Sequence, residues 1–203
     1  MQNVLVIVDP FVYMNTEFET EIGNNFCFFL NHVCEIERKK GTKIIYSLGN
    51  NQNDYIPHNG ELGDTQHMTD KSINELIKIH QQDIITNSND LWHEVCNINL
   101  NNIFFGGFWF GKCVFSHVSN LIYKSHHKVK PYITMNLCLT LPNSSWIHYL
   151  FSDNNNHYSS HPTVNKNKFR YSIWGPSGFE KIKLQKSDYV PGKIQVQRGE
   201  FWR

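Results

Sequence analysis

The stretch IFFGGFWFGKCVFSHVSNLIYK, residues 103–124, predicts a buried strand, a turn and a helix in succession. Its first residues form a short apolar run, typical of a strand covered on both faces, and two glycines follow. From Cys113 onward the apolar residues recur at the three- and four-residue spacing of a helix. Cys113 is therefore expected at the turn from a buried strand into a helix.

The same alternation of strand and helix patterns fills the first 140 residues. Strands are expected at residues 4–8, 43–48, 83–86, 102–107 and 131–141, and helices at residues 18–40, 70–80, 91–100 and 113–124. Alternating strands and helices favour a doubly wound parallel sheet with right-handed crossovers. The sequence thus predicts a Rossmann-like three-layer α/β/α fold, whose ligand crevice lies at the carboxyl ends of the strands.

The chain of 203 residues is long enough for one domain with an appendage. The strand and helix alternation stops near residue 142, and a polar tract at residues 153–157 precedes aromatic-rich segments. We therefore expect an α/β domain over residues 1–150 and a C-terminal extension over residues 151–203. Its aromatic side chains are expected to pack on the core or on a neighbouring subunit, which favours a homo-oligomer.

Net charge, apolar runs and cysteine spacing disfavour several classes of protein. The formal net charge of +1 lacks the basic excess of nucleic-acid-binding domains, so no nucleic-acid partner is expected. No apolar run is long enough to span a membrane, and none resembles a signal peptide. The five cysteines include no CxxC pair and are predicted to be reduced thiols. These features predict a cytoplasmic protein without a membrane association.

Two residues could carry chemistry. A thiol at a helix N-terminus, the predicted place of Cys113, has its pKa lowered by the helix dipole, and the free backbone amides there could hold an oxyanion. Asp9 follows the buried strand at residues 4–8, where a carboxylate is costly unless it caps a turn or serves a site. The alternatives are a core cysteine in a first helical turn and a capping aspartate.

The segments VLVIVDP, residues 4–10, and residues 103–124, in this order, resemble the isochorismatase-like cysteine hydrolases. The resemblance spans residues 3–141. It implies a triad of Asp, Lys and Cys, in which Cys113 attacks an amide or related carbonyl and Asp9 is the general base. The implied Lys would follow the third strand, where this chain has instead the four residues Thr86, Asn87, Ser88 and Asn89.

Further site residues are expected around Cys113. Lys112 and His117 are the candidates to replace the Lys, and His117 lies four residues after Cys113, on the same helical face. The residues expected to bind substrate are Phe108, Trp109, Phe110, Gly111, Lys112, His117 and Asn87. The three aromatic residues among them could line a pocket or fill the cleft.

No metal and no cofactor are expected. Relatives of the resembled family bind a metal through an Asp and two His after the second strand, and the corresponding region here contains only Asp54 and His58 without that spacing. The first hypothesis is a cysteine hydrolase of a small amide or other C–N substrate that uses Cys113 and Asp9 with a substitute for the Lys, at full or impaired activity. The alternative is a catalytically inactive relative with a binding or assembly role. A nucleotide-binding Rossmann protein is disfavoured because no GxGxxG follows the first strand.

Overall fold

The computed structural model describes residues 1–10, 17–48, 76–108, 113–139 and 169–183. Within them the elements are, in chain order, β1 (Gln2–Val8), α1 (Glu17–Lys39), β2 (Lys43–Leu48), β3 (Ile84–Asn87), α2 (Leu91–Cys96), β4 (Leu100–Phe108), α3 (Cys113–Lys124), β5 (Tyr132–Leu139), β6 (Arg170–Gly175) and β7 (Gly178–Ile182).

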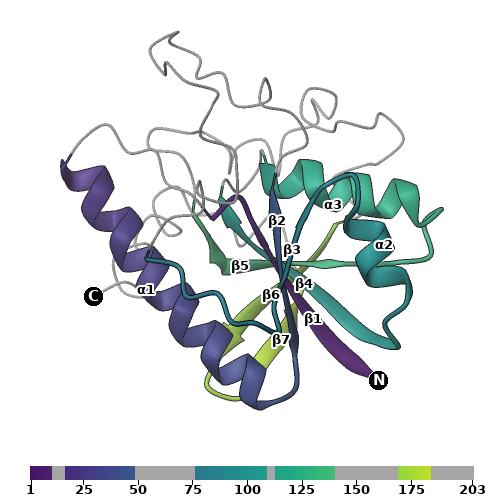
Figure 1. Ribbon diagram of the computed structural model, residues 1–203, viewed down its shortest axis with the longest axis horizontal. Coiled ribbons are helices and arrows are strands. Elements are labelled where there is room, and N and C mark those ends of the chain that lie inside the picture. The colour runs from purple at the N-terminus through teal and green to yellow at the C-terminus, as the bar shows by residue number, and fades with distance from the viewer. Residues whose placement is uncertain (11–16, 49–75, 109–112, 140–168, 184–203) are drawn as a thin grey trace, which may run out of the picture.

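The described strands form one sheet in the order β3-β2-β1-β4-β5-β6-β7. All neighbouring pairs are parallel except β6 and β7, which run antiparallel. The chain passes outward from β1 to β3 and then returns to β4 on the other side of β1, so the strand order reverses between β1 and β4. Figure 1 shows α1 on one face of the sheet and α2 and α3 on the other. The predicted doubly wound α/β fold is confirmed.

The two faces of the sheet carry separate cores. Leu5, Ile7 and Tyr46 point toward α1, whereas Val6 and Ile45 point toward α2 and α3. All five side chains are almost completely buried. Successive side chains of a strand point to opposite faces, so a strand covered on both faces needs an unbroken apolar run. This is why β1 has the sequence VLVIV over residues 4–8.

Two predicted helices differ from the structure. The helix expected at residues 70–80 is wrong over residues 76–80, the part that is described, because the chain there is irregular. Asn31 of α1 holds this segment by donating from Nδ2 to the Leu76 carbonyl (2.6 Å) and accepting from the Lys78 amide at Oδ1 (2.8 Å). The helix expected at residues 91–100 ends at Cys96 instead, because Leu100 already pairs with Gln2 of β1.

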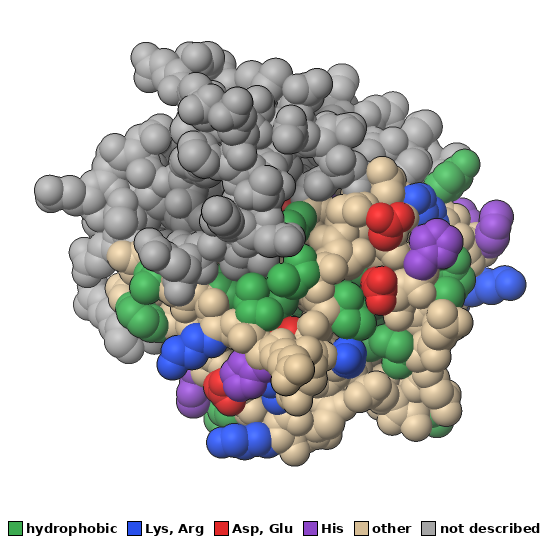
Figure 2. Space-filling view, viewed as in Figure 1, with side chains coloured by type: hydrophobic (Ala, Val, Ile, Leu, Met, Phe, Trp, Pro, Cys, Tyr) green, Lys and Arg blue, Asp and Glu red, His purple; other side chains and the backbone are tan. Residues whose placement is uncertain are grey.

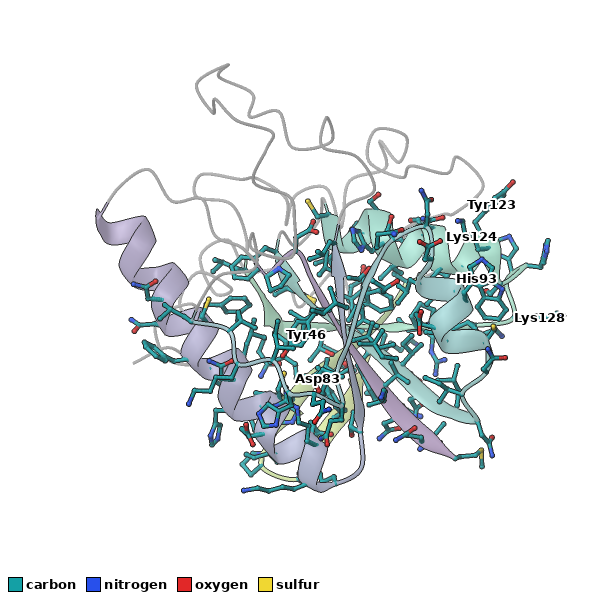
Figure 3. All side chains as sticks on the ribbon, in the orientation of Figure 1. Tyr46, Asp83, His93, Tyr123, Lys124 and Lys128 are labelled. Atoms are coloured by element: carbon teal, nitrogen blue, oxygen red, sulfur yellow. The ribbon has the colours of Figure 1, made fainter. Side chains whose placement is uncertain are left out.

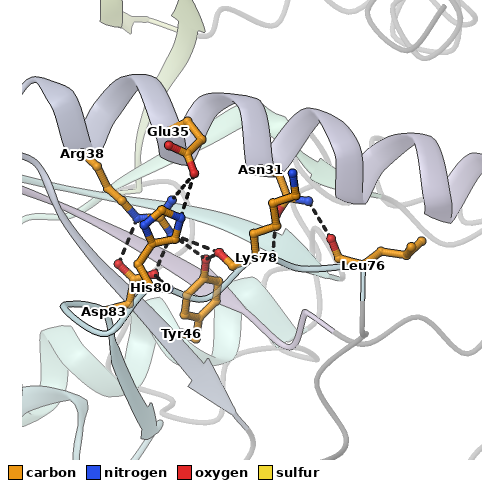
Figure 4. Close-up of polar contacts among 8 residues, drawn as sticks. All are labelled: Asn31, Glu35, Arg38, Tyr46, Leu76, Lys78, His80 and Asp83. Atoms are coloured by element: carbon orange, nitrogen blue, oxygen red, sulfur yellow. Dashed lines mark hydrogen bonds and ion pairs between the residues drawn. The ribbon is translucent and has the colours of Figure 1, made fainter.

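A buried ion pair fixes the entry to β3 (Figure 4). Arg38, near the end of α1, donates from Nε to Asp83 Oδ1 (3.0 Å) and from Nη2 to Asp83 Oδ2 (2.5 Å). Arg38 Nη2 also contacts the Tyr46 hydroxyl of β2 at 3.2 Å. Tyr46 and Asp83 lie between α1 and the sheet in Figure 3. This contact ties the start of β3 to α1 and β2.

Strands β6 and β7 extend the main sheet, because β6 pairs with β5. Trp174 of β6 donates from its indole nitrogen to the buried carboxylate of Glu37 in α1 at 3.0 Å, and Thr42 donates to the same carboxylate at 2.8 Å. The described part of the chain after residue 150 therefore adds to the first domain's sheet. The division at residue 150 stays a prediction.

The described surface mixes charges. In the view of Figure 2, lysine and arginine, acidic and histidine side chains are interspersed over the described area. Among the described helices, none is both long and apolar enough to cross a bilayer.

Candidate active site

The carboxyl ends of β1 and β4 approach each other closely because of Gly107. Gly107 lies beside Val8 in the register of the two strands and has a φ of +111°. A Cβ atom added there would lie 2.1 Å from the Val8 carbonyl oxygen. Only glycine fits such an approach, and L side chains rarely adopt this φ. The second glycine of the motif thus brings β4 against the residue that precedes Asp9.

Asp9 stands directly after β1, at the point where the strand order reverses. Its backbone amide donates to the Ser47 carbonyl of β2 at 3.0 Å, and the residue is only 2% exposed. Its φ of 45° lies in the left-handed region, which is uncommon for residues other than glycine. Ligands of open α/β sheets bind outside the carboxyl ends of the strands at this reversal. Asp9 therefore presents a buried carboxylate at the expected crevice.

Helix α3 begins at Cys113, as the sequence predicts. Cys113 is half-buried and packs against the core between the sheet and the α2–α3 layer. No acidic residue lies in the first turn of α3, so no carboxylate of that turn competes with a thiolate for the positive end of the helix dipole. His117 follows one turn later, and side chains four residues apart on a helix are neighbours.

His117 connects α3 to Asp9 and to β2. Its Nε2 lies 3.9 Å from Asp9 Oδ2, and its Nδ1 lies 3.0 Å from the Ser47 hydroxyl. Burial lowers the pKa of His117 to about 3, so the imidazole is neutral near pH 7. The contact between His117 and Asp9 is therefore made by a neutral ring and does not supply the positive charge of a lysine.

Neutral side chains fill the region after β3, where the resemblance places a Lys. Ser88 is buried, and its carbonyl accepts from Asn120 Nδ2 of α3 at 2.7 Å. The side chain of Asn87 holds the turn into α2, because its Oδ1 accepts from the backbone amides of Asn89 (2.9 Å) and Asp90 (3.1 Å).

The described lysine that contacts this region is Lys124, whose Nζ donates to the Asn89 carbonyl at 2.6 Å. Figure 3 shows Lys124 on the α2–α3 side, on the same side as His93 of α2. It lies more than three helical turns after Cys113 in sequence, so it is not placed beside the thiol.

Of the predicted site residues, the structure places Asp9 beside His117, and Cys113 lies one helical turn before His117 on α3. Phe108 is completely buried, with its ring edge-on to Phe26 of α1 at 4.7 Å, so it fills the core instead of lining a pocket. Asn87 is the last residue of β3, and its side chain holds the turn into α2. The predicted residues Trp109, Phe110, Gly111 and Lys112 lie outside the described residues.

Sequence reasoning missed Ser47 and Asn120, which connect α3 to the strand ends. A weak signal existed for each. Ser47 is a polar residue within the apolar strand KIIYSL, and Asn120 lies three residues after His117, on a neighbouring part of the helix surface. The partner of each lies on another element far away in sequence.

The described residues contain no group of three or more His, Cys, Asp or Glu side chains that could hold a metal ion. Asp54 and His58, which the sequence offered as a weak pair, lie outside the described residues. The described side chains of the candidate site thus do not make up a metal site, and no chemical step is assigned to a metal.

Comparison with known proteins gives matches in structure alone. No protein-family model matches the chain, and no curated protein matches it in sequence. A pyrazinamidase of Pyrococcus horikoshii in complex with zinc has a TM-score of 0.53 at 12% identity, over 73% of this chain and 92% of that one. An N-carbamoylsarcosine amidase from Thermoplasma acidophilum has a TM-score of 0.55 at 15% identity, over 74% of this chain and 91% of that one.

An isochorismatase-like hydrolase from Alkaliphilus metalliredigens has a TM-score of 0.50 at 11% identity, over 73% of this chain and 87% of that one. Likeness at this level of identity concerns the fold and leaves activity and substrate open. The fold that the sequence motifs predict is confirmed: the chain folds as an isochorismatase-like α/β protein.

Proposed function

We propose that the protein hydrolyses a small amide or another C–N bond, with Cys113 as nucleophile and Asp9 as general base. The observation that carries the proposal is the contact of 3.9 Å between Asp9 and His117, one turn after Cys113. It joins the carboxyl end of β1 to the first turns of α3 at the place where the sheet reverses its strand order. In this proposal the buried carboxylate and the thiol lie at the strand ends, where sheets of this type bind ligands.

The reaction requires two stages. Asp9 takes the proton of the Cys113 thiol, and the sulfur forms a bond to the substrate carbonyl carbon. The C–N bond then breaks, and the proton on Asp9 passes to the leaving nitrogen. In the second stage, water attacks the thioester while Asp9 takes a proton from the water. The C–S bond breaks, the acid product leaves, and the proton on Asp9 returns to the Cys113 sulfur, so the balance is amide and water to acid and amine.

The other described cysteines are less suited to this role. Burial raises the pKa of Cys27 and of Cys34 to about 12, and it raises the pKa of Cys138 as well. Cys96 is exposed and lies at the C-terminal end of α2, at the opposite side of that helix from its N-terminus. Cys113 lies at the opposite, favourable end of its helix.

Two of the structural neighbours support the proposed substrate class. One is a pyrazinamidase and the other an N-carbamoylsarcosine amidase, and each of these names describes the cleavage of a C–N bond next to a carbonyl. A small substrate of this type is also what a cysteine nucleophile paired with a carboxylate base can process.

One observation favours the alternative, a relative that binds ligands without turning them over. Asn120 and Ser88 form a neutral hydrogen-bonded pair beside the region where the resemblance places a Lys. Without a cation from that region, the negative charge that develops on Asp9 and on the substrate oxygen has less stabilisation. The alternative therefore predicts binding of small amides with no release of ammonia.

The test measures ammonia released from pyrazinamide and from N-carbamoylsarcosine by the purified full chain. Release is expected from at least one compound, and Cys113→Ser and Asp9→Asn should each abolish it. Cys96→Ser is the matched control and should leave the rate unchanged. Release that persists in Cys113→Ser would contradict the proposed nucleophile, and binding of both compounds without any release would support the inactive alternative.

A further inference from the structure

Ser47 occupies an unusual place in β2. It lies on the side of the strand that also carries Ile45, facing α2 and α3, and it is completely buried. A hydroxyl in such a place is costly unless it has a hydrogen-bond partner. Its partner is His117 Nδ1 at 3.0 Å, while the Ser47 carbonyl accepts from the Asp9 amide. One residue thus contacts both members of the Asp9–His117 pair.

The neutral imidazole of His117 carries one N–H, and two arrangements are open to it. If the proton is on Nδ1, His117 donates to Ser47, and the lone pair of Nε2 faces the Asp9 carboxylate at 3.9 Å. If the proton is on Nε2, Ser47 donates to Nδ1, and the N–H faces the carboxylate. Electrostatics favours the second arrangement, because the positive end of the N–H dipole then points at the negative charge.

We propose that Ser47 is a positioning residue whose hydroxyl donates to His117 Nδ1 and thereby directs the His117 Nε2–H at the carboxylate of Asp9. The neutral N–H then faces the Asp9 carboxylate from the side of α3, with 3.9 Å between Nε2 and Oδ2. In the described part of the chain, the titratable groups around His117 are Asp9, at the end of β1, and Cys113, one turn earlier on α3.

This arrangement gives the site a polar contact that does not need a lysine. Its consequence for catalysis rests on the proposed function: an oriented Asp9 carboxylate takes the proton from Cys113 more readily than one that is free to rotate. The tautomer of His117, in contrast, is a property of the resting protein. It can be measured whether or not the protein has any activity.

The first experiment records long-range ¹H–¹⁵N correlations of the full chain with ¹⁵N-labelled histidine between pH 5 and 8. His117 is assigned by the signals that disappear in His117→Gln. We expect an unprotonated Nδ1 and a protonated Nε2 throughout this range. Ser47→Ala should give a mixture of tautomers, and Ser47→Thr, which keeps the hydroxyl, should restore the single form. A protonated Nδ1 in the wild type, or an unchanged tautomer in folded Ser47→Ala, would overturn the inference.

The second readout separates this inference from the proposed function. If ammonia is released, Ser47→Ala should lower kcat by roughly tenfold, the worth of about one hydrogen bond, with KM unchanged because Ser47 is fully buried. Ser47→Thr should restore most of kcat. The expected tautomer without any activity would leave the inference standing and remove the proposed function. Activity together with a protonated Nδ1 would support the proposed function and overturn the inference.

Discussion

Replacing Gly107 by alanine should damage the protein more than replacing any other described glycine. A Cβ at Gly107 would lie 2.1 Å from the Val8 carbonyl oxygen, and ordinary contact begins at about 3.4 Å, so β1 and β4 would have to separate by more than 1 Å. The φ of +111° adds backbone strain. Strain of about 1–2 kcal/mol and overpacking of about 1–3 kcal/mol together predict a loss of roughly 2–5 kcal/mol of unfolding free energy.

Gly41→Ala is the matched control, because Gly41 also has a positive φ, +82°, but a Cβ there meets nothing within 4 Å. Its expected cost is the strain alone, about 1–2 kcal/mol. Urea unfolding followed by circular dichroism gives the free energy of unfolding for each variant. The reasoning is refuted if Gly107→Ala loses no more stability than Gly41→Ala.

Two further predictions concern stability. Because burial lowers the pKa of His117 to about 3, the unfolded chain takes up its proton below pH 6.5 and the folded chain does not, so stability falls as the pH drops. Between pH 6.5 and 5 this contribution is about 2 kcal/mol in urea unfolding. The His117→Gln variant should lack this pH-dependent contribution. An equal pH dependence of stability in the wild type and in His117→Gln would contradict a buried, neutral His117. Arg38→Met should cost about 3–5 kcal/mol by leaving Asp83 as an unpaired buried charge. The double variant Arg38→Met, Asp83→Leu should cost much less, and simply additive costs in urea unfolding would contradict the buried pair.

The fold could be predicted largely from local patterns. The boundaries of β2 and α3 agree with the predicted residues 43–48 and 113–124, because an apolar run and a helical repeat each carry their own signal. The helix expected at residues 70–80 is wrong over residues 76–80. Ile77 is apolar because its side chain packs into the core from an irregular segment. The apolar neighbours Leu76 and Ile77 therefore do not indicate a helix.

The candidate site could be predicted only in part. The place of Cys113 and the spacing to His117 depend on one helix, so the sequence contains them. That His117 faces Asp9 and Ser47 depends on how α3 packs over the ends of β1 and β2. Ser47 and His117 are 70 positions apart and Asp9 is farther still from His117, and such distant contacts leave no local pattern. The packing of Phe108 against Phe26 in the core likewise depends on tertiary structure and leaves no local sequence pattern.

The most direct test of the central claim is the rate at which iodoacetamide alkylates each cysteine at pH 7, measured by mass spectrometry of peptides. Cys27, Cys34 and Cys138 should react slowly because they are buried, so the informative comparison is Cys113 with the more exposed Cys96. We expect Cys113 to react faster than Cys96, and Asp9→Asn to remove most of this advantage. A Cys113 that reacts no faster than Cys96 would contradict its assignment as the nucleophile.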